Sequence, residues 1–327
     1  MDEFSFIDSI RPSYYKQPSL VKGIGDDAAV FRPSGQDVVT AVDTMVEGVH
    51  FSRKTMSPFY MGYRALAANL SDLSAMGSTP AFYLVSIVVP EEWEQEELNE
   101  LYTGMKSLAD EYSVDLIGGD TVSGDQLSIS VTVFGYVDRG KSRYRSSAKP
   151  DDIVFVTGTL GDSRAGLEIL LNDLSIDSKE AAFFIERHRR PVPRVDFAQS
   201  LLSIERVTLN DVSDGIASEA HEIAEASQVD LHLTMEDVPF TDFIKKWFNK
   251  SYKEWMLSGG EDFELIGTVA GEDWNVVEEA AKECGISITK IGTVKEMAHE
   301  QPEVYIYENN EKKKLMKSGY THLKRGE

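Results

Sequence analysis

The chain has 327 residues, of which 42% are hydrophobic and 27% are charged, and its formal net charge is −22. This is the composition of a globular protein, and the length predicts about two domains. The strong acidic balance excludes nucleic acid and anionic membranes as partners, because both are themselves negatively charged. With Cys284 as the one cysteine, a disulfide framework and a thiolate metal site are also excluded.

The sequence lacks the signals that would direct it out of the cytoplasm. Its first ten residues, MDEFSFIDSI, are acidic where a signal peptide is basic. No apolar run approaches the roughly 18 residues of a membrane-spanning helix. We therefore expect a cytoplasmic protein without a membrane partner.

The first half of the chain is predicted to mix strands and helices. Apolar residues at helical spacing indicate the helices, and short β-branched runs indicate the strands. In chain order the expected elements are a strand at 38–42 that ends at Asp43, a helix at 61–76, a strand at 82–89, a helix at 91–112, a short strand at 114–117 that leads into Gly118-Gly119-Asp120, and a strand at 127–137.

A polar stretch at 141–152 predicts a linker, so we expect an N-terminal domain over 1–148 and a C-terminal domain over 149–327. The second half is expected to contain strands at 153–157, 229–234 and 263–269, a strand entering Asp211, helices at 164–172, 243–248 and 276–285, a helix ending near 226, and two closing strands. Neither half alternates strictly between strand and helix. We therefore predict an α+β fold of two domains, with mixed or antiparallel sheets flanked by helices.

Aspartates recur beside glycine or other small residues at the ends of predicted elements. They are Asp26, Asp27, Asp43, Asp120, Asp211, Asp214 and Asp262. Asp72 differs, because it lies within a predicted helix on the same side as Asn69. Each aspartate alone is explained as a turn or helix-cap residue. As a set they favour Mg²⁺, which binds oxygen ligands and often shares them with phosphates.

Other patterns associated with phosphate chemistry are absent or ambiguous. The sequence has no P-loop, no protein-kinase motif, no HExxH and no G-x-S-x-G. The stretch from Gly158 to Gly166 follows a strand and opens a helix, so it either contacts a phosphate or simply connects the two elements. The basic segment at 187–194 either meets a phosphate or ends a helix. The lysines at 312–314 are interpreted as a solvated turn.

Six ordered sequence blocks resemble those of the thiamine-monophosphate kinases. They are GIGDDAAVF at 23–31, VDTMVEGVHF at 42–51, NLSDLSAMG at 69–77, LIGGDT at 116–121, SDGIASE at 213–219 and LSGGEDFEL at 257–265. The resemblance extends from about residue 4 to residue 322. The block at 42–51 best separates this family from its superfamily relatives, the aminoimidazole ribonucleotide synthetases and the selenophosphate synthetases.

The resemblance implies two domains like those of aminoimidazole ribonucleotide synthetase, and a homodimer in which the N-terminal domains pair through their sheets. The N-terminal domain would bind metal and ATP, and the C-terminal domain would complete the site. It also implies that ATP phosphorylates thiamine monophosphate to thiamine diphosphate, with ATP and several Mg²⁺ ions between the two domains of each subunit.

The site residues that the resemblance implies fall into three groups. The metal positions are Asp27, Asp43, Asp72, Asp120, Asp211 and Asp214; the nucleotide positions are Tyr102, Gly119, Asp120, Arg145 and Ser213; the substrate positions are His50, Glu261 and Tyr320. Taken without the resemblance, Arg145 would be a linker arginine and His50 a structural polar residue. Ala41 and Val42 depart from the family, whose members often carry hydroxyl residues there, one of which can ligate metal.

The implied chemistry is a direct in-line transfer without a phosphoenzyme. The acceptor is a phosphate monoester, which is already ionised at neutral pH and needs no general base. Two unit charges ~4 Å apart repel by about 4 kcal/mol at an effective dielectric constant near 20, and magnesium would offset this repulsion. Two alternatives remain: another ATP-dependent synthetase of the same superfamily, or a non-catalytic acidic module that binds divalent ions or nucleotide.

Overall fold

The computed structural model describes residues 10, 12–22, 30–33 and 35–319, so three positions of interest, Asp26, Asp27 and Tyr320, lie outside it. The chain divides into two compact units. The first comprises residues 1–74 and 78–142, and the second comprises residues 75–77 and 143–327. In the part of the chain that the structure describes, no helix is both long and apolar enough to cross a membrane.

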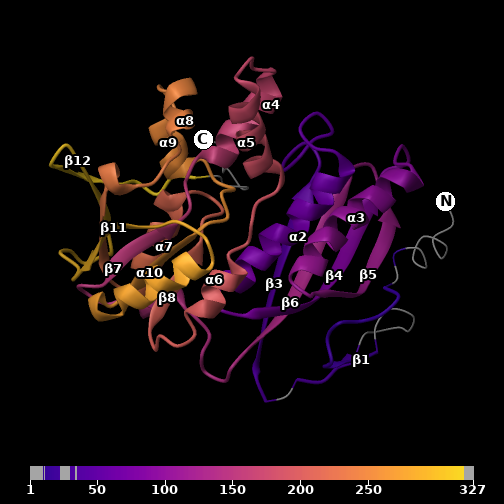
Figure 1. The fold of residues 1–327 in the computed structure, drawn as a ribbon, viewed down its shortest axis with the longest axis horizontal. Coiled ribbons are helices and arrows are strands. Elements are labelled where there is room, and N and C mark those ends of the chain that lie inside the picture. The colour runs from indigo at the N-terminus through magenta and orange to yellow at the C-terminus, as the bar shows by residue number, and fades with distance from the viewer. Residues whose placement is uncertain (1–9, 11, 23–29, 34, 320–327) are drawn as a thin grey trace. The chain divides into compact units, whose positions relative to one another are not determined.

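The first unit is built on a mixed four-stranded sheet (Figure 1). Its strand order is β3 (Asp37–Val46), β6 (Ser128–Val137), β4 (Thr79–Val89) and β5 (Asp115–Ser123). Only the β4–β5 pair is parallel. A separate short ribbon pairs β1 (Leu20–Lys22) with β2 (Val30–Phe31).

Two helices, α2 (Pro58–Ala75) and α3 (Gln95–Glu111), cover one face of this sheet (Figure 1). Burial alternates strictly along β6, so that every second side chain, such as Val131, is fully buried. The two helices touch through their backbones. A Cβ on Gly62 would lie 1.9 Å from the carbonyl oxygen of Leu101, and a Cβ on Gly104 would lie 1.9 Å from that of Phe59. Glycine at both positions is therefore required by the close approach.

Among the residues that the structure describes, the opposite face of the sheet is covered only at one end. There Leu20 and Phe31 of the β1–β2 ribbon belong to a small cluster with Phe82 and Phe134. Farther along the same face, Val42 is 59% exposed. The intervening residues of β6 on this face are only half-buried. The first unit therefore presents a partly bare, partly apolar sheet face.

The second unit contains a mixed seven-stranded sheet of order β13-β12-β9-β11-β7-β10-β8. The strands are β7 (Ile153–Thr157), β8 (Val207–Asp211), β9 (Asp230–Thr234), β10 (Leu265–Val269), β11 (Ile288–Lys295), β12 (Val304–Glu308) and β13 (Glu311–Lys314). The β9–β12 pair is parallel, and the other pairs are antiparallel.

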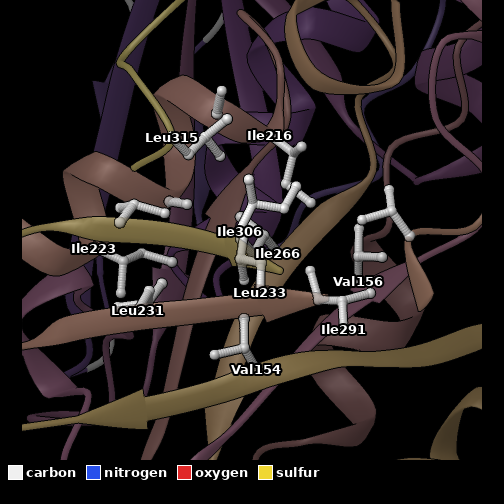
Figure 2. Packing of buried hydrophobic residues seen from close by; sticks show 14 of the residues in the cluster. Val154, Val156, Ile216, Ile223, Leu231, Leu233, Ile266, Ile291, Ile306 and Leu315 are labelled. Atoms are coloured by element: carbon white, nitrogen blue, oxygen red, sulfur yellow. The ribbon is translucent and has the colours of Figure 1, made fainter. Parts of the chain in front are cut away.

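Helices pack on both faces of this sheet. The helices of this unit are α4 (Asp162–Asn172), α5 (Ser178–Arg189), α6 (Val195–Ser200), α7 (Ile216–Ser227), α8 (Asp242–Trp247), α9 (Tyr252–Ser258) and α10 (Trp274–Glu283), of which α4, α5 and α8 pack with one another in a separate cluster. On one face Ile216 and Ile223 of α7 pack with Val156, Leu233 and Ile266 of the strands (Figure 2). The other face carries a second cluster, made with residues of α6 and α10. The predicted α+β architecture with mixed sheets and flanking helices is confirmed.

Several predicted element boundaries were wrong. Strand β3 continues through Asp43 to Val46, and β5 continues through Asp120 to Ser123, because both are hydrogen-bonded to neighbouring strands over this length. These two aspartates therefore lie within edge strands and not at turns. Helix α3 begins only at Gln95, where Glu94 and Glu97 form a capping box.

Short elements account for the remaining differences. Helices α6 and α9 were not predicted, and of α5 only the end was anticipated, as the helix end that was one of two interpretations of the basic segment at 187–194. Three strands close the chain instead of two. The predicted turn at 312–314 is strand β13, which follows a tight turn in which Asn309 and Asn310 have φ of 51° and 66°. Asparagine tolerates this left-handed conformation, and the turn allows the lysines to pair with β12.

Candidate functional site

Two loops of the second unit lie side by side and bring predicted site residues together. One begins after Asp211, the last residue of β8, and carries Ser213 and Asp214; the other follows α9 and carries Glu261. The amide of Glu261 donates to the carbonyl of Ser213 at 2.6 Å. A Cβ on Gly319 would lie 2.5 Å from the carbonyl oxygen of Asp214, so the chain passes this loop immediately before residue 320.

The loop around Glu261 has an unusual backbone conformation. Gly260, Glu261 and Phe263 have φ of 67°, 60° and 50°. A non-glycine residue in this left-handed region is disfavoured by roughly 1–2 kcal/mol, so two of them in one loop require firm anchoring. Asp262 and Glu264, both buried, supply the anchors.

Asp262 binds the N-terminus of α4. Its carboxylate accepts hydrogen bonds from the amides of Gly161 at 2.7 Å and Ser163 at 3.2 Å. Burial raises the pKa of Asp262 to about 7, against these two donors and Arg187, which lower it. The loop at 158–166, which could have contacted a phosphate, therefore has its helix N-terminus occupied by a carboxylate of the protein itself.

Glu264 is fully buried and binds two arginines of the basic segment at 187–194. Arg194 donates to its two oxygens at 2.6 and 2.5 Å, and Arg187 donates at 2.7 Å. Thr157 adds a fourth hydrogen bond at 2.7 Å. Burial alone would raise the pKa of Glu264, but Arg194 and Arg187 outweigh it and lower this pKa to about 2. Neither interpretation of the basic segment anticipated this buried partner.

Arg145 lies in the short 3₁₀ turn Arg145–Ser147, and a hydrogen-bond network joins it to the loop after β8. Its Nε donates to Oδ1 of Asn210 at 2.9 Å, and the Asn210 amide donates to Glu219 at 2.7 Å. The other oxygen of Glu219 accepts the amide of Asp214 at 3.1 Å. Burial, then Glu222 and Asp211, raises the pKa of Glu219 to about 8.

Asn210 and Glu219 were missed from sequence. Both are buried, yet they are polar residues beside the SDG motif, at the end of a strand and in the first turn of α7. The signal by which the sequence could have revealed them is a polar residue on an element whose other side chains are mostly apolar.

The predicted metal residues of the first unit that the structure describes, Asp43, Asp72 and Asp120, lie on its sheet edges and on α2. Asn69 of α2 accepts the backbone amide of Asp43 at 3.0 Å and donates to the carbonyl of Ala65 at 2.9 Å. This contact joins the helix to β3, and Asp72 lies three residues further along the helix, on the same side as Asn69. The structure thus places Asp43 and Asp72 near one another.

Asp120 is separated from this pair. Across the sheet, Asp43 of β3 pairs with Val131 of β6, which pairs with Val85 of β4. Val85 in turn pairs with Gly119 of β5, the residue before Asp120, so Asp43 and Asp120 lie on the two outer strands. Three strand spacings separate these edges by about 14 Å. One ion binds ligands at 2.0–2.1 Å, so the two carboxylates of one chain cannot share an ion.

The other predicted residues of the first unit have local structural partners. The backbone amide of Val46 donates to Nδ1 of His50 at 2.9 Å. A Cβ on Gly119 would lie 2.0 Å from the carbonyl oxygen of Val85, so strand pairing alone requires glycine there. Tyr102 of α3 is 8% exposed and lines a cavity of about 390 Å³ with Tyr83 and Lys106.

Carboxylate oxygens are the kind of ligand that magnesium prefers, but these residues do not form a complete coordination shell by themselves. Within the described ranges, no three His, Cys, Asp or Glu residues are arranged to hold a metal ion by themselves. Mg²⁺ is usually bound by one or two carboxylates together with waters and substrate phosphates. The pairs Asp43 with Asp72 and Asp211 with Asp214 fit that mode of binding.

Two protein-family models match the chain. The N-terminal domain of the AIR synthase related proteins matches residues 25–137, and their C-terminal domain matches residues 149–304. The thiamine-monophosphate kinase of Bacillus subtilis (strain 168) is 46% identical over 328 residues, which cover 99% of this chain and 100% of that protein. The chain belongs to the thiamine-monophosphate kinase family.

Solved structures of the thiamine-monophosphate kinase family agree with this assignment. The family member from Stenotrophomonas maltophilia K279a has a TM-score of 0.84 at 32% identity, over 93% of this chain and 96% of that chain. AaThiL complexed with AMPPCP and TMP has a TM-score of 0.77 at 31% identity, over 98% and 97%. The family resemblance indicated by the sequence blocks is confirmed, and so is the predicted fold class.

Proposed function

We propose that this chain transfers the γ-phosphoryl group of ATP to thiamine monophosphate, which gives thiamine diphosphate and ADP. The observation that carries the proposal is full-length similarity at 46% identity to a thiamine-monophosphate kinase. A relative with 31% identity over 98% of the chain is complexed with AMPPCP, an ATP analogue, and TMP. The loops that carry Asp211, Ser213, Asp214 and Glu261 are adjacent, as a common ligand site requires.

Magnesium, when bound, supplies charge neutralisation and alignment for the phosphoryl transfer. The residues that would hold it are Asp27, Asp43, Asp72, Asp120, Asp211 and Asp214. The acceptor is an ionised phosphate, so no side chain has to remove a proton from it. The chain's task is therefore to bind two anions and align them for direct in-line transfer.

Three further groups of residues complete the proposal. Tyr102, Gly119, Asp120, Arg145 and Ser213 would bind ATP, with Arg145 as the main protein cation on the nucleotide phosphates. The Nε2–H group of His50 would donate a hydrogen bond to the substrate phosphate, since Nδ1 of the same ring accepts the amide of Val46. Glu261 and Tyr320 would contact the thiamine rings.

A product assay tests this function. The purified chain is incubated with ATP, Mg²⁺ and either thiamine monophosphate or thiamine, and products are separated by chromatography. We expect thiamine diphosphate from thiamine monophosphate, no transfer to thiamine, and loss of turnover with a chelator. Free phosphate without thiamine diphosphate would instead indicate a synthetase-type reaction. A lack of ATP turnover would leave only a binding module.

We also propose that the bare sheet face of the first unit pairs with a second copy of the chain. Exposed valines, including Val42 at 59% and Val122 at 46%, lie on this unit's strands. The dimerisation and metal-binding domain would be 1–148, and the remainder of the site would lie on 149–327.

Sedimentation of surface variants tests the dimer. We expect Val42→Glu to shift the native dimer to a monomer, because it places a charge in an apolar contact. Val276→Glu is the matched control, because Val276 is a 40% exposed valine on α10. A native chain that sediments as a monomer, or a dimer unaffected by Val42→Glu, would refute this interface.

A further inference from the structure

Four groups of the second unit form one continuous hydrogen-bond relay. Nε of Arg145 donates to Oδ1 of Asn210, Nδ2 of Asn210 donates to Oε2 of Glu219, and the backbone amide of Asp214 donates to Oε1 of Glu219. The three distances are 2.9, 2.7 and 3.1 Å. Arg145 also pairs with Glu222 at 3.0 Å.

The relay connects an exposed group to buried ones. The Arg145 side chain is 50% exposed, whereas Asn210 is fully buried and Glu219 is 2% exposed. The backbone of Arg145 is held as well, because its carbonyl accepts the hydroxyl of Ser227 at 2.6 Å. A mobile cation is thereby held in one orientation relative to the loop at 211–215.

We propose that Asn210 and Glu219 are positioning residues for nucleotide binding, which set the guanidinium of Arg145 and the loop of Ser213 and Asp214 in one geometry. The proposal rests on the function proposed above, in which Arg145 and Ser213 contact ATP. Arginine loses affinity for a phosphate when its planar donors are misdirected, so the buried pair acts through Arg145 and needs no ligand contact of its own.

The direction of each hydrogen bond makes the relay testable by an exchange of amide and carboxylate. In Glu219→Gln, the oxygen must still accept the amide of Asp214, so the new NH₂ group faces the NH₂ group of Asn210. Asn210 must then turn over, which places its NH₂ group against the Nε–H of Arg145. Two donors therefore face one another in either orientation of Asn210, at position 219 or at Arg145.

Asn210→Asp produces the opposite conflict. Its oxygens would still accept from Arg145, but one would face Oε2 of Glu219, so two acceptors meet in a buried site when Glu219 is ionised. Because the pKa of Glu219 is raised to about 8, the comparison is made at pH 9. Nδ2 of Asn210 also donates to Oε2 of Glu222 at 3.4 Å, and that carboxylate would repel an aspartate at position 210. All variants are therefore made in a Glu222→Ala background, in which the double variant Asn210→Asp/Glu219→Gln removes both conflicts. The new carboxylate at position 210 would accept from Arg145 and from the new side-chain NH₂ group at position 219. The side-chain oxygen at position 219 would still accept the amide of Asp214. At pH 9, where Glu219 is ionised, the exchange leaves the charge unchanged, and the side-chain volumes are nearly the same.

Calorimetric titration with a non-hydrolysable ATP analogue and Mg²⁺ measures the effect. We expect each single variant to raise the Kd about tenfold, which is typical for the loss of one hydrogen bond to a charged group. We expect the double variant to bind within about threefold of the chain that carries Glu222→Ala alone. Thr208→Val is the matched control, because Thr208 is a fully buried residue of the same strand whose hydroxyl has no partner within the described residues.

The outcomes are distinguishable from those of a general packing defect. The thermal unfolding midpoint of each variant measures its stability. The Kd of the folded protein does not depend on that stability, so the two measurements separate a packing defect from a loss of binding. Rescue in the double variant supports the relay, including the case in which the single variants do not fold. A double variant that fails to fold, or that binds as weakly as the single variants, overturns it.

Failure of the proposed function would appear separately. Formation of thiamine diphosphate by the native chain tests that function, whereas the titration requires only nucleotide binding. If the native chain binds the analogue but makes no thiamine diphosphate, the reaction is wrong and the relay is still decided by the rescue. If Arg145→Ala binds the analogue as tightly as the native chain, Asn210 and Glu219 have no cation to position and the inference is overturned.

Discussion

Asp72→Asn is expected to reduce turnover of thiamine monophosphate by about 10²- to 10⁴-fold while the fold remains intact. A magnesium ligand contributes several kcal/mol to the stabilisation of transferring phosphoryl groups, and each 1.36 kcal/mol is a factor of ten in rate. Asparagine keeps the shape of the side chain and removes its charge. Asp72 is partly exposed on α2, so the helix and its contact to β3 through Asn69 should persist.

Steady-state kinetics over a range of Mg²⁺ concentrations check this result. A lost ligand should raise the Mg²⁺ concentration needed for half-maximal turnover as well as lower the maximum. Asp138→Asn is the control, because Asp138 belongs to the same unit and its carboxylate accepts only an exposed side chain, Gln36, at 3.3 Å among the contacts described. Near-native turnover and Mg²⁺ dependence in Asp72→Asn would remove this residue from the metal set.

Glu264→Gln is expected to lower the free energy of unfolding of the second unit by about 3–5 kcal/mol, because it leaves two cations without their buried anion. The Arg187 and Arg194 side chains are only 16% and 12% exposed, so water cannot replace the carboxylate. A glutamine NH₂ group would also face arginine donors. Urea unfolding followed by tryptophan fluorescence measures the change, since Trp247, Trp255 and Trp274 all belong to this unit.

Glu308→Gln is the matched control for Glu264→Gln. Glu308 likewise has two cationic partners, Lys253 at 2.6 Å and Lys313 at 3.0 Å, but these lie at the surface. Solvent screens such a pair, so we expect the unfolding midpoint to remain close to native. Equal destabilisation by the two substitutions would show that burial of Glu264 is not the cause.

The dependence on pH gives an independent check of the same ion pair. The pKa of Glu264 is lowered from 4.5 to about 2, so its stabilising contribution is present above pH 4.5 and is lost as the pH falls towards 2. Glutamine does not titrate. The difference in unfolding free energy between native and Glu264→Gln should therefore be constant above about pH 5 and shrink below pH 4.5. A difference that stays constant to pH 3 would contradict the assignment.

The hydrophobic periodicity of the longer elements was sufficient to predict much of the fold. The helix at 61–76 and the strands at 127–137 and 153–157 agree closely with α2, β6 and β7. Short helices such as α6, with six residues, have too few turns for a period to be recognised. The strand ends at Asp43 and Asp120 were misplaced, because their hydrogen bonds come from strands distant in the chain.

Periodicity, motif spacing and residue chemistry are local properties of a chain, so they were enough to predict the fold class, the family resemblance and the set of carboxylates. The partners of the buried polar groups could not be read from these local properties. Glu264 meets Arg187 and Arg194 across 77 and 70 residues, and Asp262 meets Gly161 across 101 residues. Such partners are selected by the packing of whole elements, since a buried charge is stable only where the fold places its counter-charge or donors.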